Sequence, residues 1–232
     1  MKKLSVASSF PIIALMLASC GSKPNYNVSL KADADSAGYY IGYFYSQQMK
    51  GIGDELNIDA IAKGWQEGRS ASDSVAEANM QKAQMYLNTY FQNVQTRINT
   101  QNLEESKAWM EENKKKQGIV TMPSGLQYRI ITEGTGIRPE KEDTVAVIYH
   151  GTLTDGTVFD SSKDRNQTID FPINGLVEGF SEALQLMPEG SVWEIFIPAE
   201  LGYGERVNPR GKIKPNSVLI FEVNSVKVKK SR

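Results

Sequence analysis

The 232-residue sequence contains only one cysteine and one histidine. A single cysteine excludes a framework of intrachain disulfides. A single histidine argues against a histidine-rich metal site and against a Ser-His-Asp triad, and we expect neither a metal nor a cofactor. Acidic and basic residues nearly balance, at 27 against 26, so a nucleic-acid partner is not expected. The remaining composition is ordinary for one or two globular domains.

The one cysteine, Cys20, ends a short apolar leader. Residues 1–3 are Met-Lys-Lys and residues 4–18 are mostly apolar or small, a pattern typical of a secretory signal and too short for a membrane span. The ending Leu17-Ala18-Ser19-Cys20 resembles the lipobox of bacterial lipoproteins, in which the cysteine is lipidated. We therefore expect a lipoprotein signal peptide at 1–19, a polar tether at 20–30, and a protein anchored in the bacterial cell envelope, facing the periplasm or in the outer membrane. A plain signal peptide that contains a cysteine is the alternative.

Residues 31–68 show a helical pattern interrupted by glycines. Asp33 or Asp35 is placed to cap a first helix that runs to Met49, and Asn57 is placed to cap a second that ends near Gly68. The first helix carries a dense aromatic cluster: Tyr39, Tyr40, Tyr43, Phe44 and Tyr45. Because aromatic residues dominate both cores and interfaces, this cluster predicts core packing or a dimer contact.

Residues 69–117 contain no glycine and no proline, so nothing there breaks a helix. Ser74 to Glu77 has the form of a capping box, and three lysines followed by Gly118 are typical of a helix end. A helix of about forty residues is roughly 60 Å long. Its apolar stripe thins after Ile98, which predicts a stalk with its first half packed in an interface and its second half acting as a spacer. A break near residues 99–102 is the alternative.

Beyond a connection at residues 118–123 the segments become short, β-rich and separated by turn residues. Strands are expected near residues 126–131, 144–149, 168–171, 191–197 and 217–228. Residues 177–187 form a short amphipathic helical pattern that Pro188 stops. One sheet wrapped around one short helix makes residues 119–232 an α+β domain, preceded by an all-α domain at 31–118.

The stretch from Gly156 to Asn166 places an acid directly after an apolar pair. Phe159 and Asp160 are adjacent, so in an extended strand they point to opposite faces. Asp160 then needs a partner, and Arg165 is close enough in sequence for a charge-assisted bond across a compact loop. The alternative is a hairpin end with a solvated ion pair, which would contribute little.

Five dispersed segments of the C-terminal half resemble, in the same order, the FKBP-type peptidyl-prolyl cis-trans isomerases. These segments are YHGTL at 149–153, DGTVFDSS at 155–162, ALQLMPEG at 183–190, LGYGER at 201–206 and LIFEV at 219–223. The N-terminal half resembles the helical dimerisation domain of the macrophage infectivity potentiator-like branch. In that branch two chains intertwine and a long helix holds the catalytic domains apart.

In that family the substrate site is an apolar bowl between a curved antiparallel sheet and the short helix. The resemblance implies that Tyr203 donates a hydrogen bond to a substrate carbonyl and that Asp160 lies at the rim of the bowl. The implied catalytic residues are Asp160, Tyr203, Phe159, Tyr149 and Phe221. The implied substrate-binding residues on the floor, rim and outer walls are Val177, Phe180, Arg165, Ile169, Phe171 and Ile213.

Three features depart from the family pattern. Phe180 stands where the family usually has tryptophan, which keeps an apolar floor but loses bulk and an N–H donor. The segment 207–215 carries extra charge where the family is usually apolar, so the mouth of the bowl is expected to be more basic. His150 stands where threonine is usual, and we expect a hydrogen-bonded structural histidine there, with a pH switch as the alternative.

The resemblance implies a peptidyl-prolyl cis-trans isomerase that assists the folding of exported proteins by stabilising the twisted X-Pro amide in an apolar pocket. Its implied partners are unfolded or exported proteins that contain X-Pro bonds, and a second copy of the chain bound through the N-terminal helices. Macrocyclic inhibitors of the family are a further implied ligand. The alternative is an envelope chaperone or peptide-binding module with weak or no isomerase activity.

Overall fold

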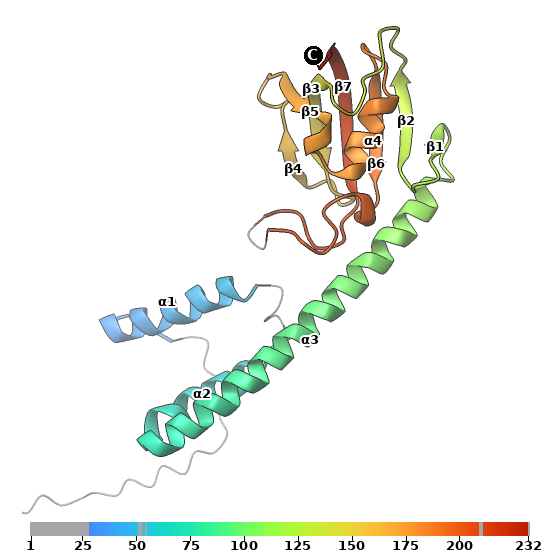
Figure 1. Cartoon of the computed structure of the whole chain (residues 1–232). Helices are drawn as coiled ribbons and strands as arrows, with labels where there is room; N and C mark the ends of the chain where they lie inside the picture. Colours follow the sequence, from blue (N-terminus) through green and yellow to red (C-terminus); the bar gives the residue numbers. More distant parts are fainter. Residues whose placement is uncertain (1–27, 51–52, 54, 209–210, 232) are drawn as a thin grey trace, which may run out of the picture. The chain divides into compact units, whose positions relative to one another are not determined.

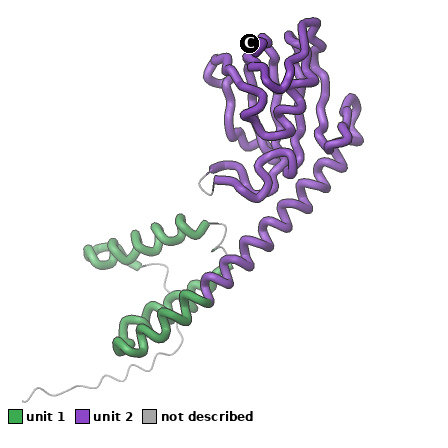
Figure 2. Tube along the Cα trace, viewed as in Figure 1, with its two compact units in different colours: residues 1–85 green, residues 86–232 purple. Residues whose placement is uncertain are grey.

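The computed structural model describes residues 28–50, 53, 55–208 and 211–231. The predicted signal peptide, Cys20 and most of the predicted tether lie outside the described residues. The chain divides into two compact units, residues 1–85 and 86–232 (Figure 2), and the division falls inside the longest helix. The sequence also predicts a domain boundary at residue 118, where the helical segments end and the β-rich segments begin. The division into compact units does not test that boundary, which stays a prediction.

The first unit contains α1 (Asp33–Gln48), α2 (Ile58–Ser70) and the start of α3 (Asp73–Asn113) (Figure 1). The cap of α2 is confirmed, because the side-chain oxygen of Asn57 accepts hydrogen bonds from the amides of Asp59 at 2.8 Å and Ala60 at 3.3 Å. Across the described residues, no helix is long and apolar enough to cross a membrane.

The predicted caps of α1 and α3 were wrong. The residue that precedes α1 is Ala32, and both Asp33 and Asp35 lie inside the first turn. Negative charge there still favours the helix, because it faces the positive end of the helix dipole. The third helix begins at Asp73, so Ser74 lies within it and cannot be the capping residue.

Helices α1 and α2 bury none of their residues. The aromatic cluster of α1 is more than half exposed at every position, from 51% at Tyr39 to 65% at Tyr40. Trp65 of α2 is 61% exposed. Of the two interpretations of the cluster, core packing within one chain is therefore not found in the described residues.

Helix α3 is continuous over 41 residues, so the alternative of a break near residues 99–102 is wrong. Its C-terminal end agrees with the prediction. The last helical residue is Asn113, and Gly118 follows with φ of +81°, a left-handed conformation that glycine adopts without strain.

The second half of α3 is not a free spacer, which corrects the prediction. Trp109 and Met110 pack against Phe196 and Val218, and the rings of Trp109 and Phe196 are 5.8 Å apart. These few apolar residues are enough to bury one side of the helix on the β-rich domain. Polar residues on either side of them, Asn102, Ser106 and Asn113, donate hydrogen bonds to the same domain. The low apolar content of this half therefore does not mean that it is fully exposed to solvent.

The second unit is built on one seven-stranded sheet in which all paired strands are antiparallel. The order is β1-β2-β6-β7-β3-β4, and β5 also pairs with β3. The strands are β1 (Ile119–Thr121), β2 (Gln127–Thr132), β3 (Thr144–Thr152), β4 (Val158–Ser161), β5 (Ile169–Pro172), β6 (Val192–Ile197) and β7 (Leu219–Lys229). The sequence missed β1 and β4, because three or four residues are too few for alternation to show.

Strand β3 organises the edge of the sheet that carries the candidate site. One of its edges pairs with β7 along its whole length. On the other edge, β5 pairs with residues 144–147 and β4 pairs with residues 150–152. The chain therefore pairs with β3 through β4, passes through the connection at residues 162–168, and pairs with β3 again through β5.

Helix α4 (Glu178–Leu186) packs across one face of this sheet (Figure 1). It buries Phe180, Ala183 and Leu184, and each large apolar side chain buried in this way stabilises the fold by roughly 1.5–3 kcal/mol. Gly179 allows the close approach, because a Cβ there would lie 2.5 Å from Cγ2 of Ile197. The predicted α+β arrangement, a sheet around one short helix after a helical region, is confirmed.

The end of β7 is tied to the start of β3 by Asp143, whose side chain is only 4% exposed. Its carboxylate accepts from the amides of Glu140 at 2.7 Å and Ser231 at 2.9 Å, and it pairs with Nζ of Lys230 at 2.9 Å. The hydrogen bond from Glu140, then those from Lys230 and Ser231, lower the pKa of Asp143 to about 2.

A carboxyl group whose pKa is lowered by folding stabilises the protein above its unfolded-state pKa, and this contribution is lost as the pH falls through the folded-state pKa. We predict that Asp143→Asn lowers the melting temperature at pH 7, and that the difference from the parent shrinks between about pH 4 and about pH 2. Thermal unfolding followed by circular dichroism at both ends of this range measures it, with the exposed Glu133→Gln as control. An equal difference at the two pH values would contradict the assignment.

Candidate active site

Five aromatic side chains from five elements meet where α4 covers the sheet: Tyr149 of β3, Phe159 of β4, Phe171 of β5, Phe180 of α4 and Phe221 of β7. Phe221 is central, with its ring centroid 4.7 Å from Phe180, 5.3 Å from Phe159 and 6.3 Å from Tyr149. Phe171 joins the group at 5.5 Å from Tyr149 and 6.1 Å from Phe180. The rings meet edge-on or tilted, which their quadrupoles favour.

Gly151 makes room for this group. It lies on β3 opposite Phe221 of β7 and Asp160 of β4. A Cβ at this position would be 2.7 Å from the ring of Phe159 and 3.0 Å from the ring of Phe221. No real side chain tolerates such contacts, so the two rings can meet over the strand only because the residue is glycine.

The aromatic group has a buried side and a partly exposed side. Phe180 is 4% exposed, Tyr149 6% and Phe221 8%. The other apolar residues that the resemblance implied are partly buried and pack against the same core: Phe159, Ile169, Phe171, Val177 and Ile213. Leu176 and Leu201 also pack there. The sequence analysis missed both, although Leu176 precedes Val177 at the entry to α4.

The polar rim of the group consists of Asp160, Tyr149 and Arg165. The hydroxyl of Tyr149 donates a short hydrogen bond to Oδ2 of Asp160. Arg165 donates to Oδ1 at 3.0 Å, and the amide of Ser161 donates to the same oxygen at 2.8 Å. The pairing of Asp160 with Arg165 is therefore confirmed as a contact. It is more than a solvated ion pair, because it includes a buried phenol and a backbone amide.

These contacts set the charge of the rim. Burial acts to raise the pKa of Asp160, but the hydrogen bonds from Tyr149, Arg165 and the Ser161 amide outweigh it, so the pKa lies below its ordinary value. Burial and the bond to Asp160 raise the pKa of Tyr149. At neutral pH the carboxylate is ionised and the phenol keeps its proton, so a fixed negative charge lies beside the aromatic rings.

Tyr203 lies in a loop that we call the Tyr203 loop, residues 199–208 and 211–216. Its side chain is 48% exposed, and its hydroxyl has no hydrogen-bond partner among the residues that the structure describes. The hydroxyl is thus available to an incoming acceptor. The same loop contributes Ile213 to the apolar core.

Lys212, one of the basic residues in the segment 207–215, donates a hydrogen bond to the backbone carbonyl of Val158 at 2.8 Å. This bond joins the Tyr203 loop to the start of β4, a contact that the sequence did not indicate. The hydrogen bond expected for His150 is present, with Nδ1 2.9 Å from Oγ of Ser161. Its other contact, to Oδ1 of Asp164, is longer at 3.6 Å.

Across the described ranges, no group of three or more histidine, cysteine, aspartate or glutamate side chains is arranged to hold a metal ion. The site as built consists of aromatic rings and one ionised carboxylate with its donors. It contains the parts needed to bind an apolar ring, and the loop that carries Tyr203 contacts the same core through Ile213.

Two family profiles match the chain. The profile described as FKBP-type peptidyl-prolyl cis-trans isomerase matches residues 135–226, and the domain amino-terminal to FKBP-type peptidyl-prolyl isomerase matches residues 34–130. The first match includes all five residues of the aromatic group. The second covers α2, α3 and all but the first residue of α1.

Individual relatives agree with the profiles. The "Outer membrane protein MIP" of Legionella longbeachae is 41% identical over 210 residues, which cover 88% of this chain and 89% of that protein. The peptidyl-prolyl cis-trans isomerase Mip of Coxiella burnetii is 46% identical over 129 residues, 56% of each chain. The crystal structure of FkpA from Escherichia coli superposes with a TM-score of 0.72 at 29% identity, covering 88% of this chain and all of that one. The chain therefore belongs to the FKBP-type peptidyl-prolyl cis-trans isomerases, in the Mip and FkpA branch that carries the amino-terminal helical domain.

Proposed function

We propose that this isomerase acts on X-Pro bonds in unfolded or newly exported proteins and that its aromatic group is the substrate site. The observation that carries the proposal is the convergence of five rings from five elements beside an ionised carboxylate. The loop that carries Tyr203 brings Ile213 to the same apolar core, and the Tyr203 hydroxyl is unpartnered among the described residues. The proline ring would lie on the partly exposed side formed by Phe159, Phe171 and Ile213, above the buried Phe180.

The reaction requires no nucleophile. Rotation about an X-Pro amide has a barrier of about 18–20 kcal/mol because the amide resonance must be broken. In the twisted transition state the carbonyl carries less negative charge than in the planar amide. An apolar site with little water therefore disfavours the planar, more dipolar amide relative to the twisted one, and a site shaped to the twist lowers the barrier.

Two polar groups, Tyr203 and Asp160, would orient the substrate peptide in this apolar site. Tyr203 would donate its hydroxyl to a carbonyl of the substrate backbone and hold the peptide in a turn-like conformation. Asp160 would act on the rotating carbonyl through its negative charge, or by keeping Tyr149 and Arg165 in place. The depressed pKa of Asp160 supports either role, because the charge persists throughout the neutral range.

We predict that Phe159→Ala and Asp160→Ala each reduce kcat/KM for an X-Pro-Phe peptide by about tenfold or more, a loss of roughly 1.4 kcal/mol of transition-state stabilisation. A protease-coupled isomerisation assay measures it. Asp170→Asn is the matched control, because Asp170 is an exposed acid on β5 that pairs with Lys229 at 2.5 Å. Its neighbours Ile169 and Phe171 pack on the aromatic core, so the alternation of the strand points Asp170 to the opposite face. Variants that retain full activity would refute the assignment of the site, and would leave a peptide-binding role as the better account.

We further propose that the chain forms a homodimer through its N-terminal helices. Its support is the apolar surface that α1 and α2 leave exposed, which includes Tyr43 at 56%, Phe44 at 58%, Ile61 at 51% and Trp65 at 61%. Soluble proteins seldom leave large apolar patches exposed unless a partner covers them. The match to the amino-terminal domain of the family supports the same assignment.

The dimer can be broken by placing charge on this surface. Phe44→Glu and Trp65→Glu are expected to shift the sedimentation coefficient to that of a monomer at micromolar concentration, since each would bury an unpaired carboxylate in an apolar interface. Lys63→Glu on α2 serves as control, because Lys63 already lies in an exposed ion pair with Glu67 at 3.3 Å. A parent protein that sediments as a monomer would exclude the proposal.

The lipid anchor is also a proposal, resting on the lipobox-like ending at Cys20. Each buried CH₂ of an attached acyl chain contributes about 0.8 kcal/mol to membrane binding, so several chains anchor firmly. We expect Cys20→Ser to move the protein from the membrane fraction to the soluble fraction and to abolish incorporation of labelled fatty acid, while Ser22→Ala leaves both unchanged. Fatty-acid labelling that survives Cys20→Ser would rule the anchor out.

A further inference from the structure

The Tyr203 loop is attached to α3 through Asn216. This asparagine is 4% exposed and has φ of +58°, a left-handed conformation that asparagine tolerates better than most residues. Its side-chain Nδ2 donates to the backbone carbonyl of Asn99 at 2.9 Å, and its own carbonyl accepts a short hydrogen bond from Oγ of Ser106. Beside it, Nδ2 of Asn102 donates to the carbonyl of Pro215 at 3.0 Å. Three successive turns of α3 thus hold the end of the loop.

The same asparagine reaches the segment that carries Tyr203. Its backbone amide donates to the carbonyl of Gly204 at 2.7 Å. The amides of Gly202 and Gly204, on either side of Tyr203, both donate to the carbonyl of Ala199 at 3.1 Å. Hydrogen bonds therefore hold the backbone on both sides of Tyr203, at Gly202 and at Gly204, and Asn216 supplies one of the bonds at Gly204.

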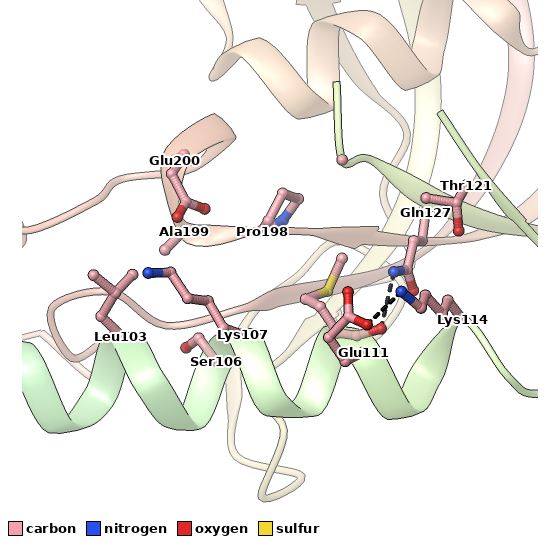
Figure 3. Close-up of a pocket in the computed structure, with 12 residues that line it drawn as sticks. Leu103, Ser106, Lys107, Glu111, Lys114, Thr121, Gln127, Pro198, Ala199 and Glu200 are labelled. Atoms are coloured by element: carbon pink, nitrogen blue, oxygen red, sulfur yellow. Dashed lines mark hydrogen bonds and ion pairs between the residues drawn. The ribbon is translucent and has the colours of Figure 1, made fainter. Parts of the chain in front are cut away.

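Apolar packing on α3 lies just beyond this attachment, where Val218 contacts Met110 and Trp109. On one side of the attachment a hollow of about 360 Å³ separates α3 from the turn at residues 198–200. Figure 3 shows Lys107 of α3 and Glu200 of that turn on opposite sides of this hollow. A second hollow of about 350 Å³ opens where Trp109 faces residues 153–155 and Lys214. Between the two hollows the loop meets the helix through hydrogen bonds.

We infer that Asn216 is a positioning residue of the isomerase, which transmits the position of α3 to the hydroxyl of Tyr203 through Gly204. The inference rests on the proposed role of Tyr203 as a donor to substrate. It also accounts for the polar residues of the second half of α3, since Asn102 and Ser106 are part of the attachment. A loop released from α3 would still contain Tyr203 but would hold its hydroxyl in many positions, and orientation is a large part of what a binding site contributes to rate.

The test uses the full-length protein with Asn216→Asp and Ser106→Ala. Aspartate keeps the size and the tolerance of positive φ but cannot donate to the carbonyl of Asn99. Ser106→Thr keeps the hydroxyl donor and should restore activity. Gln101→Ala is the control on α3, because Gln101 is exposed and, among the described residues, its side chain hydrogen-bonds to Glu105 on its own helix, at 2.8 Å, and not to the loop.

We expect Asn216→Asp and Ser106→Ala to lower kcat/KM for the X-Pro peptide by roughly 3- to 10-fold, the effect of losing one or two hydrogen bonds. The same changes made in a Tyr203→Phe background should lower it by less than about twofold, because the group being positioned is already gone. Thermal unfolding of each variant confirms that it is folded, and Ser106→Ala carries the test if Asn216→Asp does not fold.

The outcomes separate this inference from the proposed function. If Tyr203→Phe lowers activity but the Asn216 and Ser106 variants do not, or lower it equally in the Tyr203→Phe background, the positioning role is overturned and the site assignment stands. If Tyr203→Phe has no effect, the proposed role of Tyr203 fails. A second readout does not depend on activity: the ¹⁹F resonance of 3-fluorotyrosine at position 203 should shift or broaden in Asn216→Asp and stay unchanged in Gln101→Ala. An unchanged resonance in both overturns the inference.

Discussion

The contact between Phe180 of α4 and Phe221 of β7, at 4.7 Å between ring centroids, is the interaction on which the rest of the catalytic domain depends. An antiparallel sheet with one apolar face is stable only when that face is covered, and α4 is the one α-helix that packs on it in the described residues. The contact requires Gly179 on the helix, where a Cβ would lie 2.5 Å from Cγ2 of Ile197 on the sheet. It also requires Gly151 on β3, where a Cβ would lie 3.0 Å from the ring of Phe221 itself. The packing of α4 that covers the sheet therefore also brings the aromatic rings together.

The electrostatics of the site follow from the strand arrangement. Because β4 and β5 pair with the same edge of β3, the connection between them folds back over that edge, and Arg165 comes within 3.0 Å of Asp160. Tyr149 belongs to both groups: its ring packs on Phe221 and Phe171, and its hydroxyl bonds to the carboxylate. One residue therefore joins the apolar surface to the charged rim, which keeps the negative charge at a fixed place beside the rings.

The second half of the long helix α3 is an interface although most of its residues are polar. Its second half packs on the β-rich domain through Trp109 and Met110 and bonds to the Tyr203 loop through Asn102 and Ser106. A helical surface that is polar in sequence can still be an interface when its partner is a loop, because loop backbones present carbonyl groups that need donors. In this protein those carbonyls belong to Pro215 and Asn216.

Local chemistry in the sequence was enough to indicate the elements and their order. Absence of glycine and proline indicated the long helix, alternation and turn residues indicated five of the seven strands, and Asn57 was recognised as a cap. The identity of the site residues came from the ordered segments that resemble the family. Two kinds of difference from the structure have local causes. The caps predicted at Asp33 or Asp35 and at Ser74 were displaced, because several acceptable residues lie close together. Strands β1 and β4 were too short to show a pattern.

Tertiary structure alone decided the contacts between residues far apart in the chain. Nothing near Asn216 in the sequence indicates that it bonds to Asn99 and Ser106, more than a hundred residues away. The same holds for Lys212 with Val158, and for the packing of Leu201 on the aromatic core. Secondary structure arises from neighbours along the chain and leaves periodic traces in the sequence. A hydrogen bond across the fold depends on where two separate elements come to lie, and it leaves no such trace.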